Sequence, residues 1–188
     1  DNSAGVDCSD HEVNIKIALQ NAVKNKNLTY NARNKLLDSM EDEVADLVLR
    51  DNVLQTQAIS IAENQAPKLL EAQKALIRKL ESEGRLNREV EFLPSDKEID
   101  ERIINKKGLT RPELAVLLSY SKLWLYDEIL NSNVPGEEYF EQDLNLYFPQ
   151  QMRKKYTKYI ESHQLKKEII ATSITNSVIN RTNSTFFY

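Results

Sequence analysis

Apolar residues recur at intervals of three, four and seven along most of the chain, the spacing that places them on one face of an α-helix. Between residues 41 and 62 this stripe consists of Val44, Leu47, Val48, Leu54, Ala58 and Ile61. A second stripe begins after Pro67, which suits a first helical turn, and ends before Gly84, which suits a left-handed stop. The pattern predicts two consecutive amphipathic helices.

Two further helix starts are marked by the spacing S/T-x-x-E, in which a hydroxyl and a glutamate satisfy each other's free backbone N–H groups. These starts lie at Ser95–Glu98 and Thr110–Glu113. The helix expected from Arg111 to about Leu130 is apolar over most of its circumference, through Leu114, Leu117, Leu118, Leu123, Trp124, Leu125 and Ile129. We expect it to be the buried central helix of the protein.

The remainder of the chain continues the helical pattern after a turn cluster at 131–136. Shorter helices are predicted over 137–147 and 149–163, and a last helix over 165–180. The apolar stripe of that last helix is interleaved with the polar residues Thr172, Thr175, Asn176 and Ser177. With few alternating runs, the predicted fold class is all-α, a multi-helix domain of amphipathic helices around a buried central helix.

Composition excludes several classes of protein. The 188 residues, 40% of them hydrophobic, can form a core, and a single cysteine, Cys8, cannot form an intrachain disulfide. The net charge of −4 offers no general attraction for nucleic acid. No apolar run approaches the roughly 20 residues of a membrane span, and no signal peptide is recognisable. We therefore expect a soluble, cytoplasmic protein with no nucleic-acid or membrane partner.

The middle and the end of the chain contain no recognisable catalytic motif. Glycine-rich nucleotide-binding patterns and C-x-x-C or H-E-x-x-H metal motifs are missing from the sequence. The two histidines, His11 and His163, lie near opposite ends of the sequence without ligand spacing, so no metal site is predicted. A run of basic residues is interpreted as a solvated helix face, comprising Arg153, Lys154, Lys155, Lys158, Lys166 and Lys167.

The first twelve residues concentrate small, polar and ionisable side chains, so we expect a loop that can place groups against a ligand. Cys8 and His11 have the spacing of a thiolate and a base on one helix. A third S-x-x-E pattern, Ser9 to Glu12, favours a simpler interpretation. It predicts a helix that begins at Ser9, whose hydroxyl caps it, and it commits no residue to orienting His11 as a base.

Several stretches of the sequence resemble stretches that occur in the same order in the large bacterial NAD-specific glutamate dehydrogenases. The resemblance covers essentially the whole chain. These stretches occupy 1–17, 50–58, 92–96, 108–117, 147–149 and 168–172. The resemblance implies that 1–28 is the end of a catalytic domain, including the N-terminal loop, and that 29–188 is a helical C-terminal domain. It further implies a longer, homo-oligomeric parent that oxidises L-glutamate to 2-oxoglutarate and ammonium with NAD.

The opening also resembles a loop of the small glutamate dehydrogenases with the pattern Asn-Ala-Gly-Gly-Val-x-x-Ser. The resemblance places Asn2 on the nicotinamide side of the cleft, Val6 against the substrate's methylenes, and Ser9 at its distal carboxylate. The sequence departs from the pattern at Ser3 and Ala4, where the family has Ala and Gly. The family's catalytic lysine and aspartate and its dinucleotide fingerprint lie upstream, so this chain alone is expected to be inactive and to contain no catalytic residue.

Two alternatives remain. In the first alternative, the helical body from about Thr29 onward is an interaction module for subunit assembly or for regulation of the catalytic domain. Its motivation is the polar stripe of the last helix, which suits a hydrogen-bonded docking face. The second is a freestanding helical adaptor, which predicts a start codon near Asp1 in the source gene.

Overall fold

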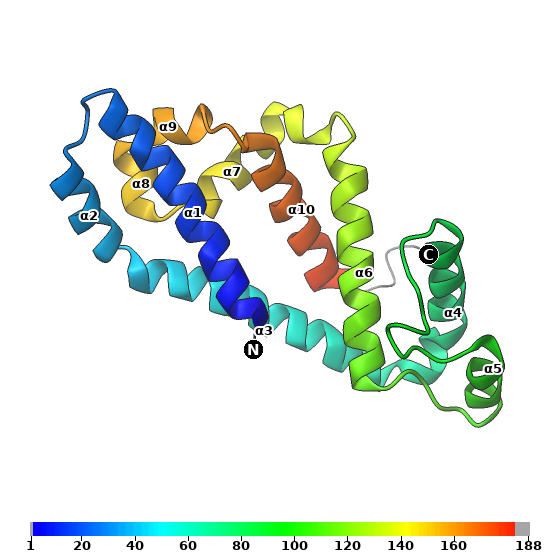
Figure 1. The fold of residues 1–188 in the computed structure, drawn as a ribbon. Coiled ribbons are helices and arrows are strands. Elements are labelled where there is room, and N and C mark those ends of the chain that lie inside the picture. The colour runs from blue at the N-terminus through cyan, green and yellow to red at the C-terminus, as the bar shows by residue number, and fades with distance from the viewer. Residues whose placement is uncertain (1, 183–188) are drawn as a thin grey trace. The chain divides into compact units, whose positions relative to one another are not determined.

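The computed structural model describes the backbone of residues 2–182 and the side chains of 10–182. All regular structure in the described part of the chain is helical, which confirms the predicted all-α class. The described helices are α1 (Asn2–Lys24), α2 (Tyr30–Asp38), α3 (Glu41–Asn64), α4 (Ala66–Ser82), α5 (Asp96–Ile104), α6 (Arg111–Leu130), η1 (Val134–Gly136), η2 (Glu138–Phe140), α7 (Glu141–Tyr147), α8 (Gln150–Lys155), α9 (Thr157–Glu161) and α10 (Lys166–Thr182) (Figure 1).

The chain divides into two compact units. Unit 1 contains residues 2–53 and 128–174, and unit 2 contains the described residues 54–127 and 175–182. The divisions fall inside α3, α6 and α10. Within the described ranges, no helix has the length and apolar character needed to cross a lipid bilayer.

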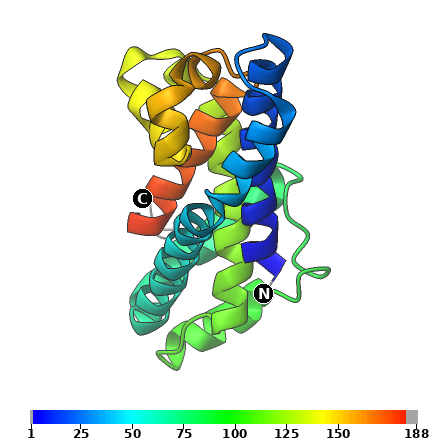
Figure 2. The same cartoon turned by 90° about the vertical axis from the view of Figure 1, so that its left-hand side faces the viewer.

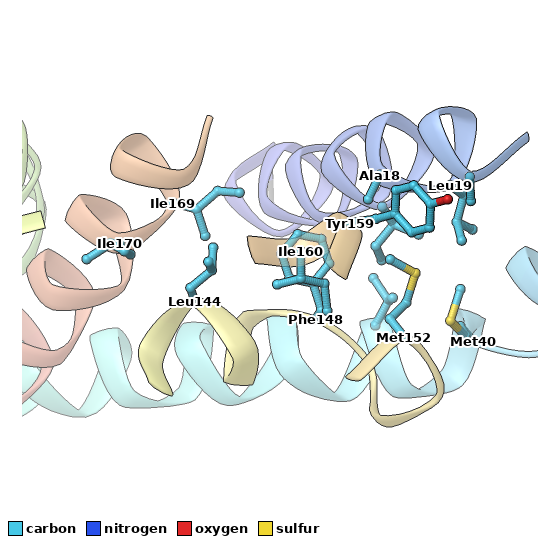
Figure 3. Close-up of a cluster of buried hydrophobic side chains, with 13 residues drawn as sticks. Ala18, Leu19, Met40, Leu144, Phe148, Met152, Tyr159, Ile160, Ile169 and Ile170 are labelled. Atoms are coloured by element: carbon cyan, nitrogen blue, oxygen red, sulfur yellow. The ribbon is translucent and has the colours of Figure 1, made fainter. Parts of the chain in front are cut away.

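Unit 1 is built on the apolar face of α1. The short helices α7, α8 and α9 gather beside α1 (Figures 1 and 2). Helices this short are unstable alone in water, so they depend on the core that they form together. That core interleaves side chains from α1 with side chains from α7 to α10 (Figure 3), among them Ile15, Ala18, Leu19, Leu144, Phe148, Met152, Ile160, Ile169 and Ile170.

Unit 2 is organised by α4, α5 and the larger part of α6. The predicted capping box is complete at the start of α5, where Ser95 and Glu98 satisfy each other's backbone N–H groups. At the start of α6 the Glu113 carboxylate accepts from the Thr110 N–H at 2.6 Å. Gly84, with φ of +68°, follows α4 in the left-handed conformation that the sequence predicts. The core of this unit contains Leu70, Leu76, Ile77, Leu80, Ile99 and Leu117.

Helix α6 has the predicted bounds but is buried only in part. Leu114, Leu117 and Leu118 are buried, whereas Leu123 is 61% exposed. The Trp124 indole N–H donates to Glu83 at 3.0 Å, which keeps this ring at the polar edge of the core. The expectation of a buried central helix therefore holds only for the first half of α6, because the core of unit 2 covers one face of its early turns.

The predicted N-terminal loop is wrong where the backbone is described. Helix α1 begins at Asn2, not at Ser9, so residues 2–9 have helical backbone. A Ser-x-x-Glu pattern also spans one turn inside a helix, and Glu12 forms an ion pair with Lys16, one turn onward. The helical backbone that precedes Ser9 leaves no helix start there for Glu12 to cap.

The single helix predicted over 149–163 is also interrupted. The structure separates α8 from α9 at Tyr156, where φ is −127°. The Thr157 hydroxyl donates to the Arg153 carbonyl oxygen, a bond from a side chain to the preceding turn that favours bending of a helix.

Gly108 marks the tightest approach in unit 2. A Cβ atom added there would lie 2.0 Å from the Ala66 Cβ and 2.8 Å from Ala66 backbone atoms. We expect Gly108→Ala to lower the free energy of unfolding by about 1–3 kcal/mol, because the backbone must shift to relieve this contact. Gly136→Ala is the matched control, since an added Cβ there meets nothing within 4 Å. Urea unfolding of both variants tests this, and equal losses would contradict it.

Candidate functional site

The side chains that the resemblance assigns to ligands precede the part of α1 whose side chains are described. Asn2, Val6 and Ser9 lie on helical backbone, but their side chains lie outside the described residues, as does that of Cys8. The described geometry begins at Asp10, the residue directly after Ser9. The contacts that fix α1 at Asp10 are therefore the described geometry nearest to the candidate site.

A polar cluster fixes α1 immediately after Ser9. It consists of Asp10, His11 and Asn14 on α1, Tyr147 at the end of α7, and His163 in the turn after α9. The Asn14 amide donates to the Tyr147 hydroxyl oxygen at 2.9 Å, and that hydroxyl donates to the Asp10 carboxylate at 2.8 Å. We call these five residues the α1 anchor cluster.

His163 joins the cluster from the side of the α9–α10 turn. Its Nε2 lies 3.1 Å from the Asn14 backbone carbonyl oxygen, and its Nδ1 accepts from the Leu165 N–H at 3.1 Å. This pair of bonds fixes the neutral tautomer with its proton on Nε2. The side chain is only 4% exposed, and burial lowers the pKa of His163, against smaller opposing effects of the Asn14 carbonyl and Glu168.

His11 packs on the ring of Tyr147. The two ring centroids are 4.0 Å apart with an interplanar angle of 19°, and His11 is 8% exposed. The structure thus brings both histidines, distant in sequence, into one cluster, where one stacks and the other forms hydrogen bonds. Among residues with described side chains, no three His, Cys, Asp or Glu residues form a group that could hold a metal ion.

Sequence reasoning missed Asn14 and Tyr147 as members of this cluster. Asn14 is 3% exposed and sits beside the apolar face of α1 that carries Ile15 and Ala18. A polar residue at a buried position of an amphipathic helix requires a partner, and this was the available signal. Its partner lies 133 residues away, so helical periodicity could not identify Tyr147.

The arrangement holds a helix in place and does not perform chemistry by itself. The Tyr147 hydroxyl both accepts and donates, and the carboxylate of Asp10 accepts from Tyr147 and, at 3.3 Å, from Asn14. The Asn14 Oδ1 is buried without a hydrogen-bond partner, so the cluster holds α1 through the Asn14 amide N–H groups and the Asp10 carboxylate. It places the helical backbone of Ser9 next to an anchored residue.

The basic run described from the sequence is partly engaged in ion pairs. Arg153 lies 3.8 Å from the Glu43 carboxylate, and Lys166 pairs with Glu141 at 2.8 Å. Both pairs join elements within unit 1. The interpretation as one solvated helix face is therefore right only in part: the run is divided among α8, α9 and α10, and its exposed members are Lys154, Lys155, Lys158 and Lys167.

Comparison with known proteins identifies two family matches. Residues 1–62 match the family described as the catalytic domain of bacterial NAD-glutamate dehydrogenase, and 106–188 match the C-terminal region of glutamate dehydrogenase. The α1 anchor cluster thus draws Asp10, His11 and Asn14 from the first match and Tyr147 and His163 from the second.

Three NAD-specific glutamate dehydrogenases are similar along nearly the whole chain. The protein of Pseudomonas aeruginosa is 46% identical over 99% of this chain, that of Halomonas elongata 42% over 96%, and that of Mycobacterium tuberculosis 43% over 100%. The chain spans only 12%, 11% and 12% of their respective lengths. It therefore corresponds to one segment of much longer proteins.

The buried, neutral His163 predicts a pH dependence of stability. Its pKa in the folded state lies below the ordinary value of 6.5, so below that pH the unfolded state binds more protons. The free energy of unfolding should fall as pH drops from 6.5 towards the folded pKa, by at most about 1.4 kcal/mol per pH unit from this group. In His163→Gln, which cannot titrate, unfolding between about pH 7 and 5 should show a flatter pH profile. Parallel profiles for the two proteins would contradict this.

Proposed function

The chain belongs to the bacterial NAD-specific glutamate dehydrogenases, as a segment of them, and on that premise we propose that it is part of an enzyme acting on L-glutamate. The reaction converts L-glutamate, NAD⁺ and water to 2-oxoglutarate, ammonium, NADH and a proton. The observation that carries the proposal is the match of 1–62 to the catalytic domain of that family, together with similarity along the whole chain.

Three residues at the start of α1 receive roles in this proposal. Asn2 faces the nicotinamide side of the cleft, Val6 contacts the substrate's methylenes, and Ser9 binds the distal carboxylate. Unpaired N–H groups at a helix start favour a bound carboxylate, but Ser9 lies inside α1 and its N–H is not at a helix end. Support for these roles comes from the family resemblance.

The residues present do not form a dinucleotide site. The sequence lacks G-x-G-x-x-G, and Gly5, the only glycine near the assigned residues, lies within helical backbone and not in a turn. NAD would therefore be held mainly by other parts of the enzyme, with Asn2 as the single contact proposed here. This chain alone is proposed to be inactive, since it also lacks the family's catalytic lysine and aspartate.

The domain assignment is part of the same proposal. Residues 1–28 would complete the catalytic domain, and 29–188 would form the helical C-terminal domain. This boundary rests on the family resemblance alone, because 2–28 and 29–53 lie in the same compact unit and the catalytic-domain match extends to residue 62. We also propose, from the family resemblance, that the full-length enzyme is a homo-oligomer. We further propose that it is cytoplasmic, which is consistent with the single cysteine of this chain.

A second proposal is that the helical region serves as an interaction module, and an exposed loop of unit 2 favours it. Phe92 is 89% exposed and Val90 66% exposed. Phe92 also adopts φ of 55°, a conformation that is unfavourable for an aromatic residue and typical of functional positions. A large apolar side chain held in this way suits a complementary pocket on another protein surface.

The loop that carries Phe92 is held rigidly. Arg88 pairs with Glu81, lies 3.0 Å from Asp96 and donates to the Pro94 carbonyl oxygen at 3.2 Å. Hydrogen bonds from Arg78 and then Arg88 lower the pKa of Asp96 to about 2, so this carboxylate stays charged. The exposure of Phe92 is therefore a property of a fixed loop.

The polar stripe of α10 does not provide the exposed docking face expected from the sequence. Thr175 is 1% exposed, and Thr172, Asn176 and Ser177 are partly buried. The loop that carries Phe92 is therefore the proposed interaction surface. Its proposed partner is the remainder of the longer enzyme, because the chain covers only 12% of a similar protein's length.

Ser9→Ala in the full-length enzyme tests the substrate site. We expect kcat/KM for glutamate to fall about 5- to 150-fold, because a hydrogen bond to a charged carboxylate contributes about 1–3 kcal/mol. The KM for NAD should hold. L-norvaline, which has the same chain length but no distal carboxylate, is the control substrate, and its kcat/KM should change little. Equal effects on kcat/KM for the two substrates would contradict the proposed contact between Ser9 and the distal carboxylate. Separately, NADH formation by the 188-residue chain alone would contradict its proposed inactivity.

Phe92→Ser tests the interaction surface by comparing two contexts. In the 188-residue chain the unfolding midpoint should stay within about 1 °C, since an exposed side chain contributes little. In the full-length enzyme it should fall by about 2–4 °C, because an apolar contact is lost there. Tyr139→Ser, at a residue that is 82% exposed, is the control and should be neutral in both. An unchanged midpoint for Phe92→Ser in the full-length enzyme would contradict the proposal.

A further inference from the structure

We propose that Tyr147 is a positioning residue for substrate recognition, which acts by fixing the part of α1 that carries Ser9. The inference rests on the proposed function. It assigns to the C-terminal region, through α7, a direct influence on how the catalytic region distinguishes substrates. Tyr147 itself is not proposed to touch the substrate.

The first support is the geometry of the hydroxyl. It donates to Asp10 at 2.8 Å and accepts from Asn14 at 2.9 Å, two residues one helical turn apart. Two contacts separated along a helix fix both its rotation about its axis and its position along that axis. Asp10 follows Ser9 by one residue, which is about 1.5 Å and 100° along an α-helix, so the backbone of Ser9 is fixed with it.

The second support is that other members of the α1 anchor cluster hold the same turn. His11 stacks on the Tyr147 ring at 4.0 Å, and His163 Nε2 lies 3.1 Å from the Asn14 carbonyl oxygen. Asn14 and His163 are almost fully buried, at 3% and 4% exposure. An alternative placement of α1 would leave buried polar groups without partners, which is costly. The cluster therefore favours one register of α1 over shifted ones.

The third support is where the members lie in the two family matches. Tyr147 and His163 fall within the match to the C-terminal region, at 106–188, whereas the α1 members fall within the catalytic-domain match, at 1–62. All members of the cluster belong to unit 1, so the contact lies within one compact body. Displacement of a substrate-binding group by about 1 Å can reduce catalysis strongly, which gives this contact a route to influence selectivity.

The test is Tyr147→Phe in the full-length enzyme, with kcat/KM measured for glutamate and for norvaline. Phenylalanine keeps the ring that stacks on His11 and removes only the hydroxyl. The change removes two hydrogen bonds but leaves Ser9 in place, so we expect the glutamate-to-norvaline ratio to fall about threefold to tenfold, less than in Ser9→Ala, with an unchanged KM for NAD. If Tyr147 had only a structural role, its loss would lower the amount of folded enzyme. The apparent kcat/KM would then fall equally for both substrates, and the ratio would be unchanged.

Tyr120→Phe is the matched control. The Tyr120 hydroxyl donates to Glu91 at 2.7 Å within unit 2, so the same atom is removed from a comparable bond outside unit 1. This variant should leave the ratio unchanged. A Ser9→Ala/Tyr147→Phe double variant should show a smaller loss of ratio than the product of the two single losses, since both act on the same contact.

The outcomes separate this inference from the proposed function. Wild-type enzyme that fails to oxidise glutamate with NAD overturns both. If Ser9→Ala lowers the ratio but Tyr147→Phe leaves it unchanged, or if Tyr120→Phe lowers it equally, only the positioning role is overturned. The inference is supported if the ratio falls in Tyr147→Phe but not in Tyr120→Phe, and if the loss in the double variant is smaller than the product of the two single losses.

Discussion

The burial of Asn14 is the constraint on which unit 1 depends. The Asn14 amide is 3% exposed, and its N–H group donates to the Tyr147 hydroxyl, 133 residues away in sequence, whereas its Oδ1 has no hydrogen-bond partner. The neighbouring apolar residues of α1, including Ile15 and Ala18, are covered by the same short helices. Helices of five to seven residues such as α9 and α7 do not persist alone, so α1 and the α7–α9 segment require each other.

Helix positions could be predicted where the determining forces are local. Periodic apolar residues identified α3 and α4, and caps at Ser95 and Thr110 located the starts of α5 and α6. Errors arose where one pattern is compatible with two structures. Ser9-x-x-Glu12 occurs inside a helix as well as at its start, and an apolar circumference does not reveal how much of α6 is covered.

The candidate site was predictable to a different extent. The roles of Asn2, Val6 and Ser9 come from resemblance to a family and not from any physical pattern within the chain. The α1 anchor cluster, by contrast, is physically explicit in the structure but could not be derived from one sequence. The bonds of Tyr147 join it to residues 133 and 137 positions away, and neither helical periodicity nor capping rules relate such distant positions.

The polar character of this cluster explains why it specifies one arrangement. Apolar side chains attract one another without directional preference, so a purely apolar contact between α1 and α7 tolerates sliding or rotation at modest cost. The hydroxyl of Tyr147 reaches both Asp10 and Asn14 in only one register, and His163 adds a further directional bond to the same turn. A shift of α1 would unpair the buried Asn14 N–H group and the buried His163 Nε2, and this penalty is larger than the net gain from a satisfied bond. The core thus supplies stability, whereas the cluster selects the position of the part of α1 that follows Ser9.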